Sequence, residues 1–280
     1  MAFVWDWQAL TAEGVEPFTQ EMERNIVQTF LNRCSVQGKR CGKKEFFDRP
    51  DHIVITRDIL EETGLTDHQM NALMKVYEGL QGIYEPTLTP GSEADPLGIC
   101  YRADKERFQQ EFFYIFRWAL GKNFDFSKFD FERDGKKVQV ALSEYLDATS
   151  TDLSAFRNHG GKLLLIHGTA DPIIPMTSSI RYFQAVQDKM GDTSDFFRMF
   201  LMPGMGHGVG GPGVQDYVIG FSALPKDEKH FGLLTLKAWV EQGKAPDVIT
   251  PVSYKPGSDP AHDSDSVNYE MEVKPFQSAL

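Results

Sequence analysis

The feature that most limits the fold of this chain is a run of four aliphatic residues, 163–166, that is followed at once by His167-Gly168. A short continuous apolar run with a turn signal after it is typical of a strand buried on both faces, as the interior strands of parallel sheets are. A helix is predicted next, over 178–190, and then a second strand over 197–202. This order of strand, helix and strand predicts a layered α/β sheet.

The residues before this sheet are predicted to be mainly helical. One apolar helical face extends over 22–31 after Thr19, which suits an N-cap. A second helix lies between Thr66, which with Gln69 fits a capping box, and Gly79, which suits a helix end. A third helix with an aromatic face is predicted over 104–120. A last helix is predicted after the sheet, from Leu233 to Gly243, and the chain from 251 on is rich in Pro, Ser and Asp and is expected to be loop.

Composition excludes two classes of partner. The formal net charge is −11, which repels a phosphate backbone, and basic clusters such as Lys39-Arg40 are too short to form a track for nucleic acid. No apolar run approaches the roughly 20 residues that cross a bilayer, and residues 1–7 lack the basic and apolar parts of an export signal. We therefore expect no nucleic acid and no membrane as a partner. Cys34, Cys41 and Cys100 allow at most one intramolecular disulfide, so the disulfide state stays open.

Candidate catalytic residues lie in the two loops that follow the predicted strands. His167-Gly-Thr-Ala-Asp171-Pro172 places Asp171 just beyond the first strand, and Pro203-Gly-Met-Gly-His207 places His207 beyond the second. Ligands gather at the carboxyl ends of the strands of an open α/β sheet. An acid followed by a histidine, each after one of two consecutive strands, is the chain order of the last two members of an α/β-hydrolase triad.

The chemistry expected of this pair is acid–base catalysis. The Asp171 carboxylate would hold the His207 tautomer and stabilise the imidazolium that forms when the ring takes a proton from a serine. A purely structural explanation stands beside this one. Asp before Pro is common in turns, and a histidine in a glycine-rich loop can simply be solvated.

Three stretches of the sequence resemble the tannase and feruloyl esterase family. They are residues 152–172, which end in His167-Gly-Thr-Ala-Asp171-Pro172, residues 196–207, which end in Pro203-Gly-Met-Gly-His207, and residues 236–246. The resemblance implies that Asp171 is the triad acid and His207 the triad base. Members of this family split esters of hydroxylated aromatic acids such as gallate or ferulate, so the resemblance also implies an aromatic ester substrate. It further implies a Ser-His-Asp mechanism, no cofactor, and a secreted or periplasmic protein.

The resemblance extends from the first helix to about Pro246 and implies a fold. Residues 147–250 would be the C-terminal portion of an α/β-hydrolase sheet, and residues 1–146 a mainly helical lid region before it. The loop-rich tail, 251–280, would follow. Tyr77-Glu78-Gly79 and Pro90-Gly-Ser-Glu93 resemble parts of the lid that the family inserts between the nucleophile and the acid.

The chain departs from the family where the nucleophile is expected. A hydrolase of this type needs Gly-x-Ser-x-Gly at a sharp strand-to-helix turn, which exposes the serine and builds the oxyanion hole. The sequence contains no such string. The nearest, Cys34-Ser-Val-Gln-Gly38, lacks the first glycine and follows a predicted helix, so Ser35 is a poor candidate.

Two further features of the family are not expected here. The lid segment that carries the aspartates of a calcium loop in the family corresponds to residues 34–44, which hold lysines and an arginine instead. Because these side chains cannot bind a cation, we expect no metal at this segment. Gly208 stands where the family commonly has a cysteine, so the disulfide of that cysteine is not expected either.

The missing serine leaves three explanations open. The chain is a fragment of a longer hydrolase, or it pairs with a separately encoded N-terminal half, or it is an inactive remnant or ligand-binding pseudoenzyme; we favour the fragment. Two strands are a small part of a hydrolase sheet, so the run 163–166 would present an unpaired edge that recruits a partner or self-associates.

The other histidines are given structural roles. His167 ends a buried strand and is expected to be packed or to support the site from behind. The remaining ones are expected at the surface: His52, His68, His159, His230 and His262.

Overall fold

The computed structural model of the protein describes residues 2–36, 39–40, 45–80, 85–104 and 114–277, with only the backbone described over 35–40. The chain divides into two compact units, each built from two segments of the sequence. The first comprises Met1–Cys34 and Val54–Thr149, and the second comprises Ser35–Ile53 and Ser150–Leu280. None of the helices described has the length and apolar character needed to span a bilayer.

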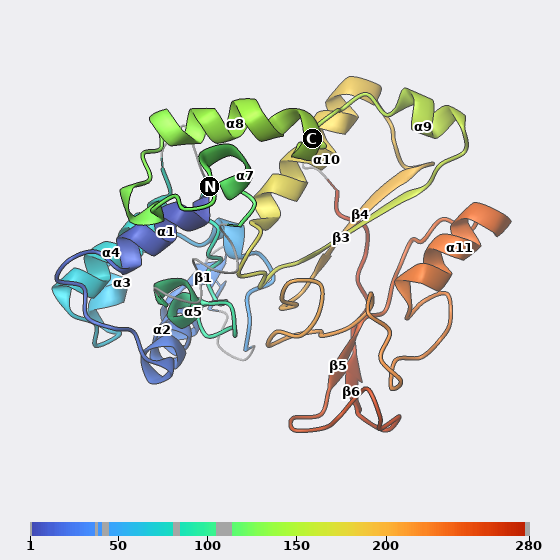
Figure 1. The fold of residues 1–280 in the computed structure, drawn as a ribbon. Helices are drawn as coiled ribbons and strands as arrows, with labels where there is room; N and C mark the ends of the chain where they lie inside the picture. The colour runs from blue at the N-terminus through green and yellow to red at the C-terminus, as the bar shows by residue number, and fades with distance from the viewer. Residues whose placement is uncertain (1, 37–38, 41–44, 81–84, 105–113, 278–280) are drawn as a thin grey trace. The chain divides into compact units, whose positions relative to one another are not determined.

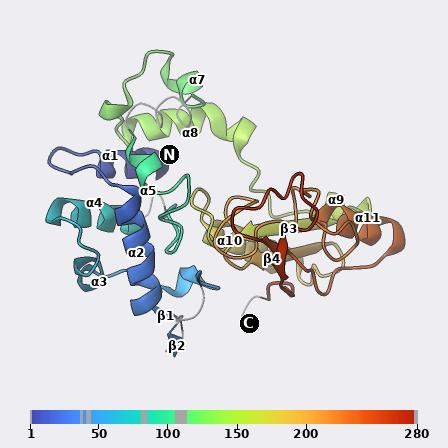
Figure 2. The ribbon, with the colours of Figure 1, turned by 90° about the horizontal axis from the view of Figure 1, so that it is seen from below.

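The first unit is built from helices (Figure 1). They are α1 (Ala2–Leu10), α2 (Gln20–Arg33), α3 (Arg57–Glu61), α4 (Asp67–Glu78), α5 (Ile99–Ala103), α7 (Arg117–Leu120) and α8 (Arg133–Leu146), with 3-10 turns at Pro50–His52 in the second unit and Phe126–Lys128 in the first. Helix α1 packs against α4 and α5, and α7 lies beside α8 (Figure 2). The core between them includes Val4, Trp7 and Phe126, all buried.

The caps predicted for two helices of this unit are confirmed. The Thr19 side chain accepts a hydrogen bond from the backbone N–H of Met22 at the start of α2. Thr66 and Gln69 form the reciprocal capping box of α4. These bonds satisfy backbone N–H groups that have no partner inside the helix, which is why such residues mark helix starts.

The third predicted helix differs from the structure. Most of its range, 105–113, lies outside the described residues. Of the remainder, Asp104 has an extended backbone that ends α5, and only Arg117–Leu120 is helical. Helices α1 and α8 were not expected. At the start of α8, Asp130 Oδ1 accepts the backbone N–H of Arg133 at 2.6 Å and Asp134 Oδ2 accepts the N–H of Asp130 at 3.1 Å, so Asp130 is a local start signal that the sequence analysis missed.

The second unit contains the predicted sheet. Strands β3 (Leu163–Gly168) and β4 (Phe197–Met202) pair in parallel, with Leu163 opposite Phe197 and Gly168 opposite Met202. The other elements of the unit are β1 (Ser35–Val36), β2 (Lys39–Arg40), α9 (Ser154–Asn158), α10 (Met176–Met190), α11 (Gly232–Gln242), β5 (Val252–Tyr254) and β6 (Val267–Glu270). The pair β5 and β6 is antiparallel and lies in the segment that was expected to be loop.

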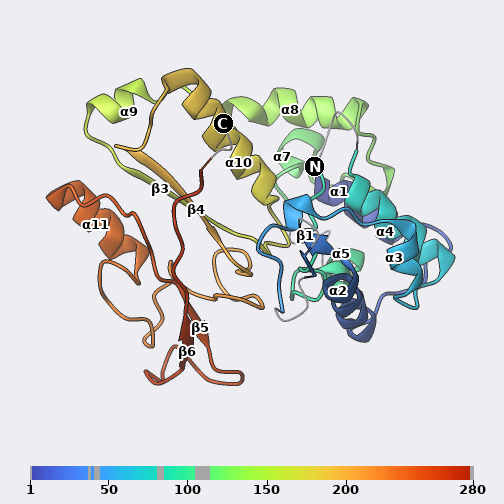
Figure 3. The ribbon, with the colours of Figure 1, turned by 180° about the vertical axis from the view of Figure 1, so that it is seen from behind.

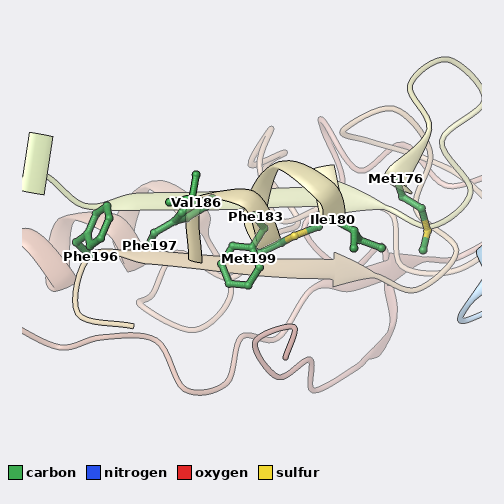
Figure 4. Close-up of a cluster of buried hydrophobic side chains, with 7 residues drawn as sticks. All are labelled: Met176, Ile180, Phe183, Val186, Phe196, Phe197 and Met199. Atoms are coloured by element: carbon green, nitrogen blue, oxygen red, sulfur yellow. The ribbon is translucent and has the colours of Figure 1, made fainter. Parts of the chain in front are cut away.

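Chain segments pack on both faces of the sheet (Figure 3), but the prediction of a strand buried on both faces is only partly met, because Leu163–Ile166 of β3 are half-buried while most of β4 is buried. Helix α10 covers one face, where Ile180, Phe183 and Val186 pack against Phe197 and Met199 (Figure 4). On the other face Phe200 and Met202 belong to a second cluster, formed with the chain before and after α11: Val214, Tyr217, Ile249 and Val273. Burial is therefore nearly complete for β4 and partial for β3, and it is a main source of the stability of the pair.

The two edges of the sheet differ in the hydrogen bonds that their backbone groups make. On the β4 side, the backbone N–H of Phe276 donates to the carbonyl of Met199 at 2.7 Å, so the C-terminal segment lies along that edge. On the β3 side, Leu164 and Ile166 turn their backbone groups away from β4, because alternate residues of a strand point to opposite sides. Among the described residues these groups have no hydrogen-bond partner.

Candidate active site

The two loops predicted to carry the site meet at the ends of β3 and β4. Parallel strands place their carboxyl ends at the same edge of the sheet, so the loops after them are neighbours. The backbone N–H of Thr169 donates to the carbonyl of Met202, and the N–H of Ala170 donates to the carbonyl of Met205, both at 2.9 Å. The acid loop and the histidine loop are thus joined by main-chain hydrogen bonds.

Asp171 and His207 are brought together at this edge. The Oδ2 atom of Asp171 lies 2.8 Å from Nδ1 of His207. Because a carboxylate only accepts hydrogen bonds, Nδ1 carries the proton and donates it, which leaves Nε2 with a lone pair that can take up a proton. Asp171 is buried, whereas 54% of the His207 side chain is exposed, so the basic nitrogen belongs to a ring that other molecules can reach.

The second carboxylate oxygen of Asp171 holds its own loop. Oδ1 accepts hydrogen bonds from the backbone N–H groups of Ile173 at 2.8 Å and Ile174 at 3.0 Å. This is the local turn in which an aspartate bonds the backbone two and three residues further on. The two oxygens of one carboxylate therefore have separate partners, the turn on one side and His207 on the other.

Thr169 links three segments beneath the pair. Its hydroxyl donates to the carbonyl of Phe47 at 3.0 Å and accepts from the N–H of Gly204 at 2.8 Å. The side chain is buried, so neither bond competes with water. This link was not expected from the sequence, since Phe47 is separated from Thr169 by more than a hundred residues.

Two glycines permit the close approach of the loops. A Cβ on Gly168 would lie 2.2 Å from the carbonyl oxygen of Met205, so the strand end has no room for a side chain. Gly204 has a positive φ of 69°, which is rarely adopted by other residues, and a Cβ there would lie 2.5 Å from the Phe46 ring. The glycine content of the loop is thus required by its geometry.

His167 lies directly behind the acid. Its ring is almost buried, with Nδ1 2.8 Å from the Ser179 hydroxyl in α10 and Nε2 3.0 Å from the carbonyl oxygen of Ile174. Nε2 also lies 3.6 Å from Oδ2 of Asp171, the oxygen that bonds His207. The expectation of a packed, supporting histidine agrees with this placement. Ser179 was not singled out from the sequence.

Ser35 does not lie at a strand-to-helix turn. It opens the two-residue strand β1, which follows α2 and pairs with β2. Among the described residues, Asp171 is the only hydrogen-bond partner of His207, and no serine occupies the position of a nucleophile beside its ring.

No metal centre is found among the described residues. Within the described ranges, no three His, Cys, Asp or Glu side chains are grouped so that they could hold a metal ion. Residues 41–44 of the segment compared with a calcium loop lie outside those ranges, as does Cys41, so the expectations about them stay predictions. A hollow of about 800 Å³ lies beside the histidine loop, between Val209–Pro212 and the β5–β6 hairpin, but neither Asp171 nor His207 lines it.

Comparison with known proteins gives a consistent result. A family model described as tannase and feruloyl esterase matches residues 102–269, which include both loops of the site. A probable feruloyl esterase B of Aspergillus niger is 28% identical over 275 residues, which are 92% of this chain and 50% of that protein. Mono(2-hydroxyethyl) terephthalate hydrolase of Piscinibacter sakaiensis is 38% identical over 138 residues, 46% of this chain and 21% of that protein.

A solved structure shares the fold. Feruloyl esterase B from Aspergillus oryzae superposes with a TM-score of 0.76 at 22% identity, over 98% of this chain and 57% of that one. The chain thus has the fold of a part of this esterase. It spans about half, or less, of the length of the relatives described here.

Proposed function

The chain belongs to the tannase and feruloyl esterase family, and on that premise we propose that it supplies the acid and the base of a carboxylic ester hydrolase. The observation that carries the proposal is the hydrogen bond of 2.8 Å between Asp171 Oδ2 and His207 Nδ1, at the strand ends where such a pair is expected. In this proposal residues 147–250 are the C-terminal portion of an α/β-hydrolase sheet, and residues 1–146 form its lid.

The proposed reaction assigns one role to each residue. His207 Nε2 accepts the proton of a serine hydroxyl as the serine oxygen attacks the ester carbonyl, and the ring then gives this proton to the departing alcohol. Asp171 keeps Nδ1 protonated and stabilises the imidazolium by its negative charge. Water repeats the cycle on the acyl-serine and releases the acid. The serine itself is proposed to come from outside the 280 residues.

The proposed substrate is an ester of an aromatic acid. Support comes from two relatives, a feruloyl esterase and a terephthalate monoester hydrolase, because both names describe esters of aromatic carboxylic acids. These proteins differ in the acid they release, so the proposal extends to the class of substrate and not to one compound.

The open edge of β3 supports the proposed origin of the serine. Natural proteins usually block an exposed edge with charge, proline or a covering segment, and within the described part of the chain a segment is hydrogen-bonded only to the β4 edge. We propose that β3 is an interior strand of the complete sheet and that its partner strand belongs to the serine-bearing part, either in the same gene product or in a separate chain.

The experiment begins with the gene. The coding sequence upstream of the Met1 codon is read for an in-frame Gly-x-Ser-x-Gly, and the extended chain is expressed and assayed with a methyl ester of a hydroxycinnamic acid. We expect turnover from the extended chain, little or none from the 280 residues alone, and a loss of at least about 10³-fold in kcat/KM for His207→Ala in the extended chain.

A matched control shows whether the loss of activity is specific to His207 or follows from the replacement of any histidine. His159→Ala changes an exposed histidine in the same unit, away from Asp171, and should leave kcat/KM unchanged. Full activity of the His207→Ala variant would refute the proposal. Robust activity of the 280 residues alone that disappears in Ser35→Ala would instead place the nucleophile at Ser35.

A second candidate function is that of an inactive remnant or ligand-binding pseudoenzyme. The observation that favours it is the absence of a nucleophile elbow from the sequence. An upstream region without coding potential, together with no activity after mixing with any serine-bearing chain encoded nearby, would support this candidate over the hydrolase.

A further inference from the structure

We propose that His167 is a positioning residue that fixes the orientation of the Asp171 carboxylate toward His207. The inference rests on the proposed function, in which these two residues are the acid and the base, and it adds a third side chain to the site. His167 belongs to β3 and not to either loop, so it can transmit the rigidity of the sheet to the acid.

His167 and Asp171 are connected through hydrogen bonds to the same residue, Ile174. His167 Nε2 lies 3.0 Å from the carbonyl oxygen of Ile174, and the N–H of the same Ile174 donates to Asp171 Oδ1 at 3.0 Å. Both polar groups of one residue are therefore used, one by the histidine and one by the acid. By bonding the Ile174 carbonyl, His167 restricts the local turn after Asp171. This turn holds Oδ1 of Asp171 through the N–H of Ile174.

This arrangement determines where the other carboxylate oxygen points. Once Oδ1 is held by the N–H groups of Ile173 and Ile174, rotation of the carboxylate is restricted and Oδ2 faces His207. His167 Nε2 lies 3.6 Å from Oδ2. The proton on Nε2 thus also lies close to the negative oxygen that orients the base.

The protonation of His167 follows from its partners. A carbonyl oxygen only accepts, so the contact at Ile174 requires a proton on Nε2. Nδ1 lies 2.8 Å from the Ser179 hydroxyl, which can donate or accept and so satisfies this nitrogen in either case. The Ile174 carbonyl therefore keeps a proton on Nε2 of His167, as Asp171 keeps one on Nδ1 of His207.

A role for Ser179 as a nucleophile is less consistent with this geometry. Ser179 lies within helix α10, after three helical residues, and its hydroxyl is hydrogen-bonded to a buried ring. The strand-to-helix turn that exposes a nucleophile is absent there. The series of contacts from Ser179 through His167 to Asp171 is thus explained by positioning.

The test compares two amides that imitate different ring nitrogens. In His167→Gln the side-chain NH₂ reaches the place of Nε2 and can donate to the Ile174 carbonyl. In His167→Asn the shorter amide reaches only the place of Nδ1, beside Ser179. Both variants are polar and uncharged, and the gap that the shorter Asn leaves would lower stability without by itself changing the tautomer of His207. Far-UV circular dichroism and thermal unfolding check that each variant is folded.

The readout is the tautomer of His207 in the full chain with ¹⁵N-labelled histidine. Long-range ¹H–¹⁵N correlation spectra show which ring nitrogen carries the proton, and His207→Ala assigns the signals. We expect the wild-type chain and His167→Gln to carry the proton on Nδ1. In His167→Asn the ratio of the Nε2–H to the Nδ1–H tautomer should rise roughly fivefold, the size of one net hydrogen bond. His159→Gln is the control and should match the wild type.

Three results would overturn the inference. They are a wild-type His207 protonated mainly on Nε2, a His167→Asn variant with the wild-type ratio, and a His167→Gln variant that shifts as far as His167→Asn. No substrate or nucleophile is needed for this measurement. Failure of the proposed function in the ester assay would therefore leave the tautomer result standing, and the reverse also holds.

Discussion

The buried hydroxyl of Thr169 accepts the backbone N–H of Gly204 at 2.8 Å and donates to the carbonyl of Phe47, so one side chain joins the acid loop, the histidine loop and a distant segment. Thr169→Val keeps the shape of the side chain and removes both bonds. Because a buried donor and a buried acceptor then lack partners, we expect the free energy of unfolding to fall by about 3 kcal/mol. Urea denaturation measures the change. Thr169→Ser keeps the hydroxyl and should lose less than half as much; equal losses would show that the methyl group and not the hydroxyl matters.

The contact between Gly168 and the carbonyl of Met205 predicts that a single methyl group disturbs the site. In Gly168→Ala the new Cβ would overlap backbone atoms, which cannot rotate away as a side chain could. We expect the histidine loop to be displaced and the melting temperature to fall clearly. Gly160→Ala is the matched control, because its Cβ meets no atom within 4 Å and only the positive φ is strained, at a cost of about 1 kcal/mol. A Gly168→Ala variant as stable as the control would contradict the tight contact.

A buried carboxyl group in the first unit predicts a pH dependence of stability. Burial raises the pKa of Glu93 to about 7, although the Tyr77 hydroxyl and the N–H of Gly91 donate to it and lower the pKa. The folded state thus holds its proton at a pH where the unfolded state has lost it. The contribution of Glu93 to stability is complete below about pH 4.5, falls as the pH rises, and is lost above about pH 7.

Glu93→Gln measures this contribution, because glutamine stays neutral at every pH. We expect the variant to gain stability relative to the wild type between pH 4.5 and 7, by an amount on the order of 3 kcal/mol at the upper end. Chemical denaturation at a series of pH values gives the difference. Glu21→Gln, at an exposed position of α2, should show no such trend. A constant difference between Glu93→Gln and the wild type over this range would contradict the raised pKa.

Asp216 predicts a graded effect of two substitutions. Its carboxylate accepts the backbone N–H groups of Val218, Ile219, Gly220 and Phe221 and also the Tyr254 hydroxyl at 2.9 Å. Burial, and then the Asp216 carboxylate, raise the pKa of Tyr254, so the hydroxyl remains a donor. Tyr254→Phe should cost about 1 kcal/mol, and Asp216→Asn, which turns an NH₂ group toward these donors, about 3 kcal/mol or more. A reversed order in denaturant unfolding would refute the assignment of Asp216 as the centre of this loop.

The sequence predicted those elements whose signals are local. The α2 and α4 caps and the apolar run of β3 are each contained in a few neighbouring residues. Strands β5 and β6 were missed because their pairing joins Val252 to Glu270 across an irregular connection, and a three-residue strand has too little alternation to be recognised. Helix α8 was missed because Asp130, whose carboxylate accepts the N–H of Arg133 at the helix start, was not recognised as a cap.

The same distinction applies to the candidate site. That Asp171 and His207 lie close together could be predicted, because both follow strands that were expected to be parallel neighbours. The supports of the pair could not be predicted, since Thr169 bonds a carbonyl more than a hundred residues away and His167 bonds a hydroxyl in the following helix. Such contacts depend on how elements pack, and no pattern of residue types records them.

The two oxygens of the Asp171 carboxylate have different partners, so the retention of Asp171 is not by itself a sign that catalysis has been retained. One oxygen maintains the turn at Ile173 and Ile174, so selection for a folded protein would keep Asp171 even in a lineage that no longer cleaved esters. His207 is different, because its ring is half exposed and, among the described residues, its one hydrogen bond is to Asp171. In a comparison of close relatives, variation at position 207 beside an invariant aspartate would mark the loss of catalysis, and joint retention would mark an enzyme still in use.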